Sequence, residues 1–119
     1  MGHQPIDPAT IRDYHAHVYY DADSRAAAAR LREEIERSFV VEMGRWRDAP
    51  VGPHPQPMYQ VKFGVEQFAR IVPWLMLNHA GLTILIHPNT GEDWRDHAEN
   101  ALWLGRRLRL RLKMLRQRA

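Results

Sequence analysis

The sequence predicts an α+β fold in which helices cover one face of an antiparallel sheet. Three observations support this prediction. Short segments of apolar and polar residues in two-residue alternation are separated by segments with helical periodicity. Proline, glycine and aspartate lie between these segments, where turns are expected. The chain has 119 residues, which is the size of one domain and enough to bury a core without covalent cross-links.

The first half of the chain predicts three strands and one helix. Residues 14–20 are rich in aromatic side chains, which is typical of a strand. Residues 25–38 are rich in alanine and charge and carry an apolar stripe at helical spacing, so they predict an amphipathic helix. Residues 39–47 alternate and predict a second strand. Residues 48–57 contain four prolines and a glycine and predict a stiff loop, and residues 58–65 predict a third strand.

The second half predicts two helices and two strands. Residues 66–78 have helical spacing, with a kink or break expected at Pro73. Residues 82–87 predict a fourth strand, and residues 93–104 a third helix that ends at a glycine. Residues 108–114, LRLRLKM, repeat every two residues and predict a fifth strand with its three leucines and the methionine facing inward. A frayed helix is the alternative for this last segment.

The order β-α-β-β-α-β, followed by a helix and an extra strand, is that of a ferredoxin-like fold with a C-terminal extension. This topology predicts the spatial strand order 4-1-3-2, with the first strand in the centre. The helix-free face of the sheet then needs a cover, either a partner subunit or the extension. We predict a single domain over residues 1–119, with an N-terminal extension over 1–13 and a basic tail over 106–119.

Charge and composition restrict the function classes. The chain has 17 Lys and Arg, 14 Asp and Glu, and a pI near 9.7, but seven of the basic residues lie in residues 105–119, which contain no acid. The basic character is therefore local, and nucleic-acid binding is not the favoured function. No apolar run approaches the ~20 residues of a membrane span, and the N-terminus lacks an apolar signal-peptide core. We expect a soluble cytoplasmic protein without membrane contact.

The clearest candidate site is formed by histidines. His15 and His17 are two residues apart in a predicted strand and so point to the same face. His87 is predicted on that face of the neighbouring fourth strand, close to His15. Because the chain has no cysteine, a transition metal has to be held by imidazoles and carboxylates. We predict a three-histidine metal site of His15, His17 and His87. Glu42, two strands away, is a weaker candidate.

At this point the motifs YHAHVYYD, GPHP followed by MYQV, PWL…NH, LTILIHPNTG and DHAENALWLG can be taken together. Their order and spacing resemble those of the DOPA 4,5-dioxygenase family, from about Tyr14 to Leu112. The resemblance implies a ferredoxin-like and often dimeric protein. It also implies an extradiol dioxygenase that opens the ring of a catechol such as DOPA with O2 and without heme. The strongly basic tail departs from what the family leads us to expect.

The resemblance also implies roles for individual residues. The histidines that match the motifs are His15, His17, His54, His79 and His87. Fe(II), or another divalent metal, is then held by His15, His17 and His87. His54 and His79 become candidates for acid–base catalysis or substrate contacts. Candidates for substrate binding follow in the same way: Arg45, Lys62 and Tyr19. A small-molecule catechol, O2 and a second copy of the chain are the implied partners.

Simpler interpretations stay open at this stage. His54 can be an ordinary loop residue, His79 a helix C-cap, and His97 a surface or helix-packing residue. The whole chain can instead be a ferredoxin-like nucleic-acid-binding module that uses its basic tail, or a metal enzyme of another class. It can also be a non-catalytic dimer with a structural histidine cluster. Loss of metal binding and ring cleavage in a His17→Ala variant would distinguish the enzyme from the last of these.

Overall fold

A computed structural model describes residues 4–115 of the chain. Its strands and helices alternate in the order predicted from the sequence, and short 3₁₀ turns lie at Pro8–Thr10, Val65–Gln67 and Leu112–Met114. The strands and helices are β1 (Asp13–Tyr19), α1 (Arg25–Ser38), β2 (Glu42–Met43), β3 (Met58–Gly64), α2 (Phe68–Asn78), β4 (Ile84–Asn89), α3 (Asp93–Ala98) and β5 (Leu102–Leu104).

Within the described residues, the strands form one antiparallel five-stranded sheet in the order β2-β3-β1-β4-β5. Strands β1 to β4 have the order 4-1-3-2 of a ferredoxin-like fold, with β5 added beside β4, so the predicted fold class is confirmed. β1 is paired along its length with β3 on one side and β4 on the other. This central position places every β1 side chain between two neighbouring strands.

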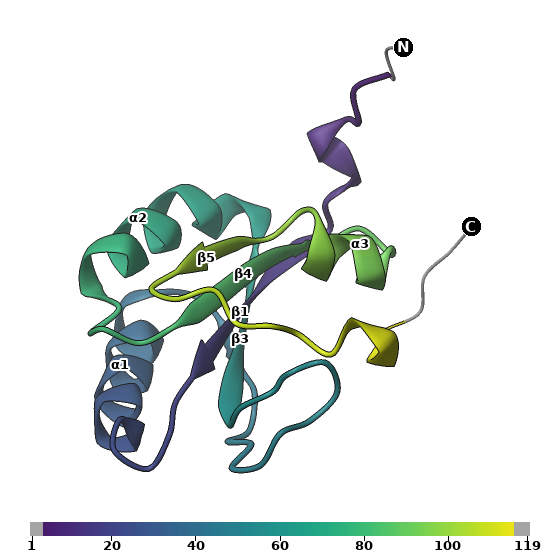
Figure 1. The fold of residues 1–119 in the computed structure, drawn as a ribbon. Coiled ribbons are helices and arrows are strands. Elements are labelled where there is room, and N and C mark those ends of the chain that lie inside the picture. Colours follow the sequence, from purple (N-terminus) through teal and green to yellow (C-terminus); the bar gives the residue numbers. More distant parts are fainter. Residues whose placement is uncertain (1–3, 116–119) are drawn as a thin grey trace.

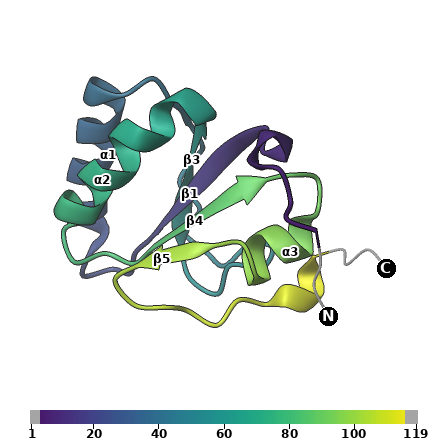
Figure 2. The ribbon, with the colours of Figure 1, turned by 90° about the horizontal axis from the view of Figure 1, so that it is seen from above.

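The molecule has three layers. Helices α1 and α2 lie on one side of the sheet, whereas α3 and the C-terminal segment lie on the other (Figures 1 and 2). The main core fills the space between the sheet and the first two helices. It includes Ile35 of α1, Leu75 of α2 and Ile84 of β4, all fully buried. Burying an aliphatic side chain of this kind contributes about 1.5–3 kcal/mol, so this layer holds the sheet in a fixed position.

The face opposite α1 and α2, which we call the helix-free face because neither of these two helices covers it, is covered by α3 and by the chain's own C-terminal segment, residues 105–112 (Figure 2). Tyr19, Met58 and Leu85 form a small second core on this face, and partly buried apolar residues pack on it. These covering residues are Ala101, Trp103, Leu108 and Leu110. Of the two covers predicted from the sequence, the extension is therefore the one observed. The expected homodimer stays a prediction that is no longer needed to cover this face.

The fifth strand is formed by other residues than those predicted. The segment 108–114 is not a strand: residues 106–111 have no regular structure, and Leu112–Met114 is a 3₁₀ turn. Its two-residue alternation has a different cause, because Leu108 and Leu110 pack across the face of the sheet rather than along an edge. Leu112 is half-buried, whereas Met114 is 64% exposed, so the inward orientation predicted for Met114 is wrong.

The predicted third helix is shorter than expected. It ends at Ala98, and residues 102–104 form β5 on the free edge of β4. The amide of Asn100 lies 3.4 Å from the carboxylate of Asp96 at the point where the helix has ended. Pairing with an open sheet edge satisfies backbone groups that a lone helical turn leaves to solvent. Tertiary pairing therefore outweighs the helical pattern here.

The predicted second strand is also shorter. β2 is limited to two residues, although the chain stays beside β3 as far as an isolated bridge between Arg47 and Met58. The amide of Gly44 donates to the carbonyl of Gln60. Between this bond and the Arg47–Met58 bridge, two residues, Arg45 and Trp46, therefore lie opposite the single residue Tyr59. This is a β-bulge, which interrupts a ladder and changes the direction of side chains.

Two smaller observations complete the fold. Helix α2 continues through Pro73, so the proline does not end the helix. Among the helices of residues 4–115, none combines the length and apolar character needed to cross a membrane.

Candidate metal centre

The register of the sheet arranges polar side chains in rows on the helix-free face. His15 lies directly between His87 of β4 and Lys62 of β3. One step along β1 on the same face, His17 lies between Leu85 and Gln60. The prediction that three histidines share one face of neighbouring strands therefore agrees with the register of the structure.

Two further histidines complete a group that we call the histidine cluster: His15, His17, His54, His87 and His97. His54 comes from the loop between β2 and β3, and His97 from α3. The ring centroids of His17 and His54 are 4.2 Å apart, and those of His87 and His97 are 3.9 Å apart. His17, His54 and His87 are at most 5% exposed, so most of the cluster is shielded from water.

The cluster contains two overlapping groups of potential metal ligands. In each group, one ring nitrogen per residue lies within 4.8 Å of the other two. The first group is the one predicted from the sequence, His15, His17 and His87. The second is His17, His54 and His97. His17 belongs to both groups, which makes it the central residue of the site.

Hydrogen bonds determine which ring nitrogens are available. Nδ1 of His87 lies 2.9 Å from the carbonyl oxygen of Pro88, and Nδ1 of His97 lies 2.8 Å from that of Asp93. A carbonyl only accepts, so each Nδ1 donates and each Nε2 keeps its lone pair. A hydrogen bond of this kind to the outer nitrogen is the usual way in which a metal-binding histidine is oriented.

The residues present fit a transition metal. The Nε2 atoms of His17 and His87 are 3.1 Å apart. Two nitrogens at roughly 2.0–2.1 Å from one ion, at right angles, are separated by about 3 Å. Within residues 4–115, Nδ1 of His17 is buried without any hydrogen-bond partner. An ion on Nε2 would not satisfy this nitrogen, so the fit rests on the Nε2 separation and on the all-imidazole set, which suits Fe, Zn or similar ions.

Burial keeps these imidazoles neutral. Loss of water is the largest cause that lowers the pKa of His17 far below its usual value, and the surrounding imidazoles lower it further. The same causes, burial first, lower the pKa of His54 to about 4 and that of His87 to about 3. The pKa of His15 is also lowered, mainly by burial. Neutral imidazole is the form that binds metal.

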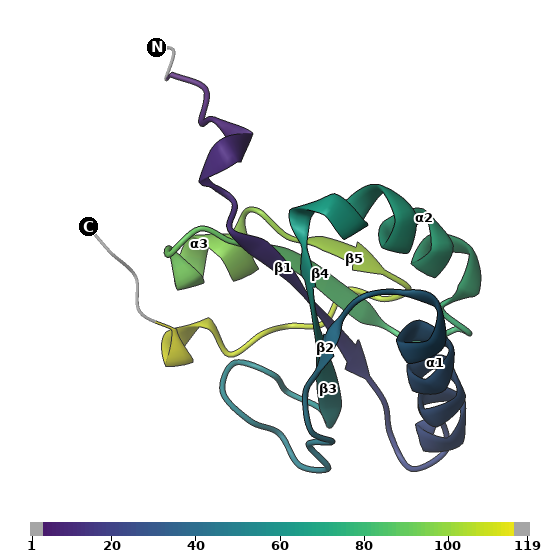
Figure 3. The same cartoon turned by 180° about the vertical axis from the view of Figure 1, so that it is seen from behind.

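The loop that carries His54 folds over the helix-free face, as Figure 3 shows for the connection between β2 and β3. Pro53 and Pro55 restrict the backbone on either side of His54. The amide of Arg111 donates to the carbonyl of Pro53 at 2.8 Å, which joins the loop to the C-terminal segment. The hydroxyl of Tyr19 lies 2.7 Å from Nδ1 of His54. These contacts fix the backbone beside His54 and one nitrogen of its ring.

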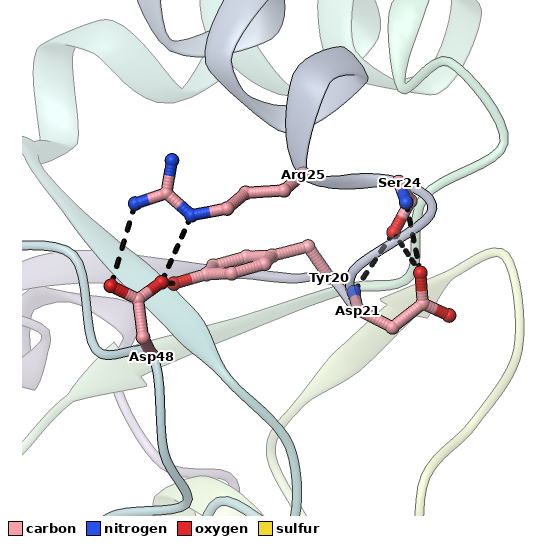
Figure 4. A network of polar contacts seen from close by, with 5 residues as sticks. All are labelled: Tyr20, Asp21, Ser24, Arg25 and Asp48. Carbon is pink, nitrogen blue, oxygen red and sulfur yellow. Dashed lines mark hydrogen bonds and ion pairs between the residues drawn. The ribbon is translucent and has the colours of Figure 1, made fainter.

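The start of the same loop is attached to α1 by a polar network (Figure 4). Asp48 accepts a hydrogen bond from the hydroxyl of Tyr20 at 2.7 Å and from Nε of Arg25 at 3.0 Å. The Arg25 guanidinium also lies 4.0 Å from the ring centroid of Trp46. Next to this contact, Asp21 and Ser24 exchange hydrogen bonds at the start of the helix. The network is largely exposed, so it positions the chain more than it stabilises it.

His97 is placed by a buried carboxylate on the same helix. Asp96 is 1% exposed and accepts hydrogen bonds from both the amide and the hydroxyl of Thr90, each at 2.8 Å. These bonds attach α3 to the end of β4, beside His87. From the sequence alone, His97 is open to interpretation as a surface or helix-packing residue. The signal that was missed is the helix's position directly after the strand that carries His87.

A cavity of about 260 Å³ opens beside the cluster, and we call it the Arg45 cavity. His17 and His54 form one wall of it, and Arg45, Arg47 and Gln60 are among its other lining residues. Within the described residues, neither arginine forms an ion pair with a carboxylate. The cavity therefore combines two cluster imidazoles with two cations available to an anionic ligand.

The remaining predicted site residues have other surroundings. Nδ1 of His79 lies 2.8 Å from the carbonyl oxygen of Leu82, and His79 belongs to neither ligand group found in residues 4–115. The connection from α2 to β4, which carries it, lies across the molecule from α3 (Figure 1). Lys62 contacts the carboxylates of Asp13 and Glu42 at 3.7 and 3.5 Å. Tyr19 contacts His54 and does not line the Arg45 cavity.

The chain is thus an α+β protein with clustered, largely buried imidazoles on the helix-free face of its sheet. This arrangement makes it a candidate metal-binding protein. The model of the Dopa 4,5-dioxygenase family matches residues 14–114. The chain therefore belongs to this family, as its motifs indicated.

Individual relatives agree with this assignment. The chain is 34% identical to an uncharacterized 21.2 kDa protein of Botryotinia fuckeliana, with 96% of this chain and 69% of that protein covered. It is also 34% identical to a DOPA 4,5-dioxygenase of Amanita muscaria, with 86% of this chain but 49% of that protein covered. The chain thus spans about half the length of the Amanita enzyme.

A solved structure is also similar. The crystal structure of a "putative dioxygenase" from Nostoc punctiforme is 53% identical in sequence and has a TM-score of 0.92. The match covers 92% of this chain and 96% of that one, so the whole fold is shared.

Proposed function

We propose that this chain is a non-heme, metal-dependent extradiol dioxygenase that opens the aromatic ring of a catechol with O2. The observation that carries the proposal is the histidine cluster itself. It places unprotonated ring nitrogens on one buried sheet face, next to a cavity with unpaired arginines among the described residues. Membership of a dioxygenase family and similarity to an enzyme named DOPA 4,5-dioxygenase support the same reaction class.

His15, His17 and His87 are the proposed ligands, with Fe(II) as the proposed metal. A bound divalent ion would supply Lewis acidity and hold the diol and O2 next to one another. His17 and His87 face one another through Nε2, and His15 lies beside His87 in the next strand. Three protein ligands would leave positions on the ion free for other ligands, as the set of two histidines and one carboxylate does in non-heme iron oxygenases.

His54 is the proposed acid–base residue. It lines the Arg45 cavity together with His17, so it lies where a diol would enter. Burial keeps the ring neutral, so one of its nitrogens has a lone pair that can accept a proton from a catechol hydroxyl. Burial raises the pKa of Tyr19, so the hydroxyl that contacts Nδ1 of His54 stays protonated. For Nε2 of His54 to accept the catechol proton, Nδ1 carries the ring proton and donates to the oxygen of the Tyr19 hydroxyl, 2.7 Å away.

Arg45 is the proposed partner of a substrate carboxylate, and the structure adds Arg47 on the same cavity. A guanidinium binds a carboxylate through two parallel hydrogen bonds, which orients the ligand as well as attracting it. Lys62 stays a weaker candidate, because two carboxylates already lie near its ammonium group. An enzyme with this arrangement prefers catechols that carry an acidic side chain over catechol itself.

The test is anaerobic reconstitution with Fe(II), followed by addition of a catechol panel in air. O2 uptake and the visible absorbance of ring-opened products are recorded for the wild type and for His17→Ala, His87→Ala and His79→Ala. We expect both signals to fall to background in the first two variants. His79 is half-buried but lies outside the cluster, so the activity of His79→Ala is expected to stay within about twofold of the wild type.

Each other outcome has a definite meaning. Iron binding without O2 uptake on any catechol would overturn the ring-cleavage proposal but keep the metal site. Failure to bind iron would identify the cluster as a structural feature. Loss of activity in His79→Ala, with iron still bound, would restore the catalytic role predicted for His79 from the sequence.

A further inference from the structure

A second cavity lies on the other side of the histidine cluster, between α3, β5 and the C-terminal segment, and we call it the C-terminal cavity. Its volume is about 350 Å³. Its lining includes His97, Trp103, Leu108 and Leu110 together with Arg107 and Arg109. It shares no lining residue with the Arg45 cavity, so the two are separate spaces.

The floor of the C-terminal cavity is apolar and rigid. The ring of Trp103 is stacked on that of Tyr19, with 6.1 Å between centroids and 18° between planes. Leu108 and Leu110 pack on the same small core beneath the C-terminal segment. A stacked indole bordered by leucines is a surface on which an aromatic ring binds with little loss of order.

The rim of the cavity is cationic. Arg107 and Arg109 are exposed, and no carboxylate within residues 4–115 forms an ion pair with either of them. Both side chains line the cavity and are two residues apart in a segment without regular structure. Two guanidinium groups above an apolar floor are suited to a carboxylate attached to a ring.

His97, a member of the histidine cluster, is also part of the wall of this cavity. Its ring is 3.9 Å from that of His87. A ligand in the C-terminal cavity therefore reaches an imidazole of the candidate metal centre without entering the Arg45 cavity.

We infer that the C-terminal cavity is a second ligand site, which binds a small aromatic carboxylate. The aromatic ring lies on Trp103, Leu108 and Leu110, and the carboxylate lies between Arg107 and Arg109. The basic C-terminal segment thus has a binding role next to the cluster. The inference does not rest on the proposed ring cleavage, because it requires neither a metal nor O2.

The test uses the full-length, metal-free protein and benzoate as the probe, with benzamide as an uncharged ligand of similar shape. Binding is measured by calorimetry for the wild type and for three glutamine variants. The first is R107Q/R109Q. The second is R111Q, which removes a charge from the same segment but does not line the cavity. The third is R45Q/R47Q, which changes the other cavity.

We expect the wild type to bind benzoate saturably. R107Q/R109Q should bind benzoate at least tenfold more weakly, and the wild type should bind benzamide at least tenfold more weakly than benzoate. R111Q should bind benzoate within about twofold of the wild type, because exposed charges at a distance contribute little. R45Q/R47Q removes only the benzoate that the Arg45 cavity holds, so the site in the C-terminal cavity should keep its affinity within about twofold. The altered arginines are exposed, so all variants should unfold at similar temperatures. Absence of saturation, equal binding by R107Q/R109Q, or loss of binding in R45Q/R47Q would each overturn the inference. None of these outcomes depends on the iron-loaded activity.

Discussion

Burial determines the charge of the imidazoles in the histidine cluster. His17, His54 and His87 lie away from water and beside one another, so a proton on any of them is opposed by desolvation and by its neighbours. In the unfolded chain the same residues have the ordinary histidine pKa near 6.5. The folded state thus keeps several imidazoles neutral over a pH range in which the unfolded state protonates them.

Acid should therefore destabilise the metal-free protein. Below pH 6.5 the unfolded state binds protons that the folded state does not, so stability falls as the pH is lowered toward the folded-state values of about 4 for His54 and about 3 for His87. Each such histidine contributes a slope of about 1.4 kcal/mol per pH unit in this range. Urea unfolding at several pH values between 8 and 4.5 measures the slope.

A His87→Asn variant provides the comparison. Removing one of these histidines should reduce the slope below pH 6.5 by about 1.4 kcal/mol per pH unit and leave stability above pH 7 independent of pH. An unchanged slope in this variant would contradict the assignment of the acid sensitivity to the cluster.

The contact between Tyr19 and His54 should matter for activity. Tyr19→Phe removes the hydroxyl at 2.7 Å from Nδ1 and leaves a buried nitrogen unpaired. Such a loss costs about 1–2 kcal/mol, which corresponds to about a 5- to 30-fold fall in kcat/KM when the ring is mispositioned. Steady-state kinetics with the best catechol of the panel measure it. Tyr59→Phe is the matched control, because that hydroxyl donates to Ala28 on the helix side of the sheet. A similar fall in both variants would indicate a general stability effect.

Alternation and topology together were sufficient to predict three members of the cluster. Two-residue alternation places His15 and His17 on the same face of the sheet, and the ferredoxin-like strand order places His87 on the strand next to theirs. His54 required more, because a stiff loop of ten residues can leave the sheet in several directions, and only its contacts with Tyr19 and Arg111 select one. No local pattern encodes those contacts.

The elements after β4 were the hardest to predict. His97 belongs to the cluster because α3 is short and is held by Asp96 and Thr90 against the end of β4. The helix is short because Leu102–Leu104 pair with an open strand edge. Both the early end of α3 and its attachment to β4 depend on contacts with residues outside the helix. The helical pattern over residues 93–104 therefore could not predict them.

The turn that ends β5 should tolerate no side chain. Gly105 has φ of +76°, and a Cβ there would lie 2.8 Å from the carbonyl oxygen of Leu82. Gly105→Ala should therefore lower the free energy of unfolding by about 2–4 kcal/mol, because backbone strain and a clash add. Gly52→Ala is the control: its φ is also positive, +54°, but nothing lies within 4 Å of the added carbon. We expect about 1 kcal/mol for that change, and equal losses in urea unfolding would contradict the role of the close contact.

For the molecule as a whole, the cluster connects parts that are distant in sequence. β1, β4, α3 and the loop before β3 each contribute histidines, and the C-terminal segment holds that loop through Arg111. The two sheet faces thus have different tasks, since the helices stabilise one and the other carries polar side chains under a thin cover. A thin cover contributes less to stability than a packed helix layer. A metal that joins β1, β4, α3 and the loop before β3 should therefore add a large fraction of the total free energy of unfolding.

Metal binding should accordingly raise the stability of the whole chain. An ion that binds the folded state alone adds about 2.7 kcal/mol at a free concentration 100-fold above its Kd, which is about 10 °C in Tm for a domain of this size. Thermal unfolding with and without Fe(II), under anaerobic conditions, measures the shift. The His17→Ala variant should lose the shift because His17 belongs to both ligand groups, whereas Tyr59→Phe should keep it. A shift of the same size in His17→Ala would place the metal elsewhere and separate the histidine cluster from the proposed reaction.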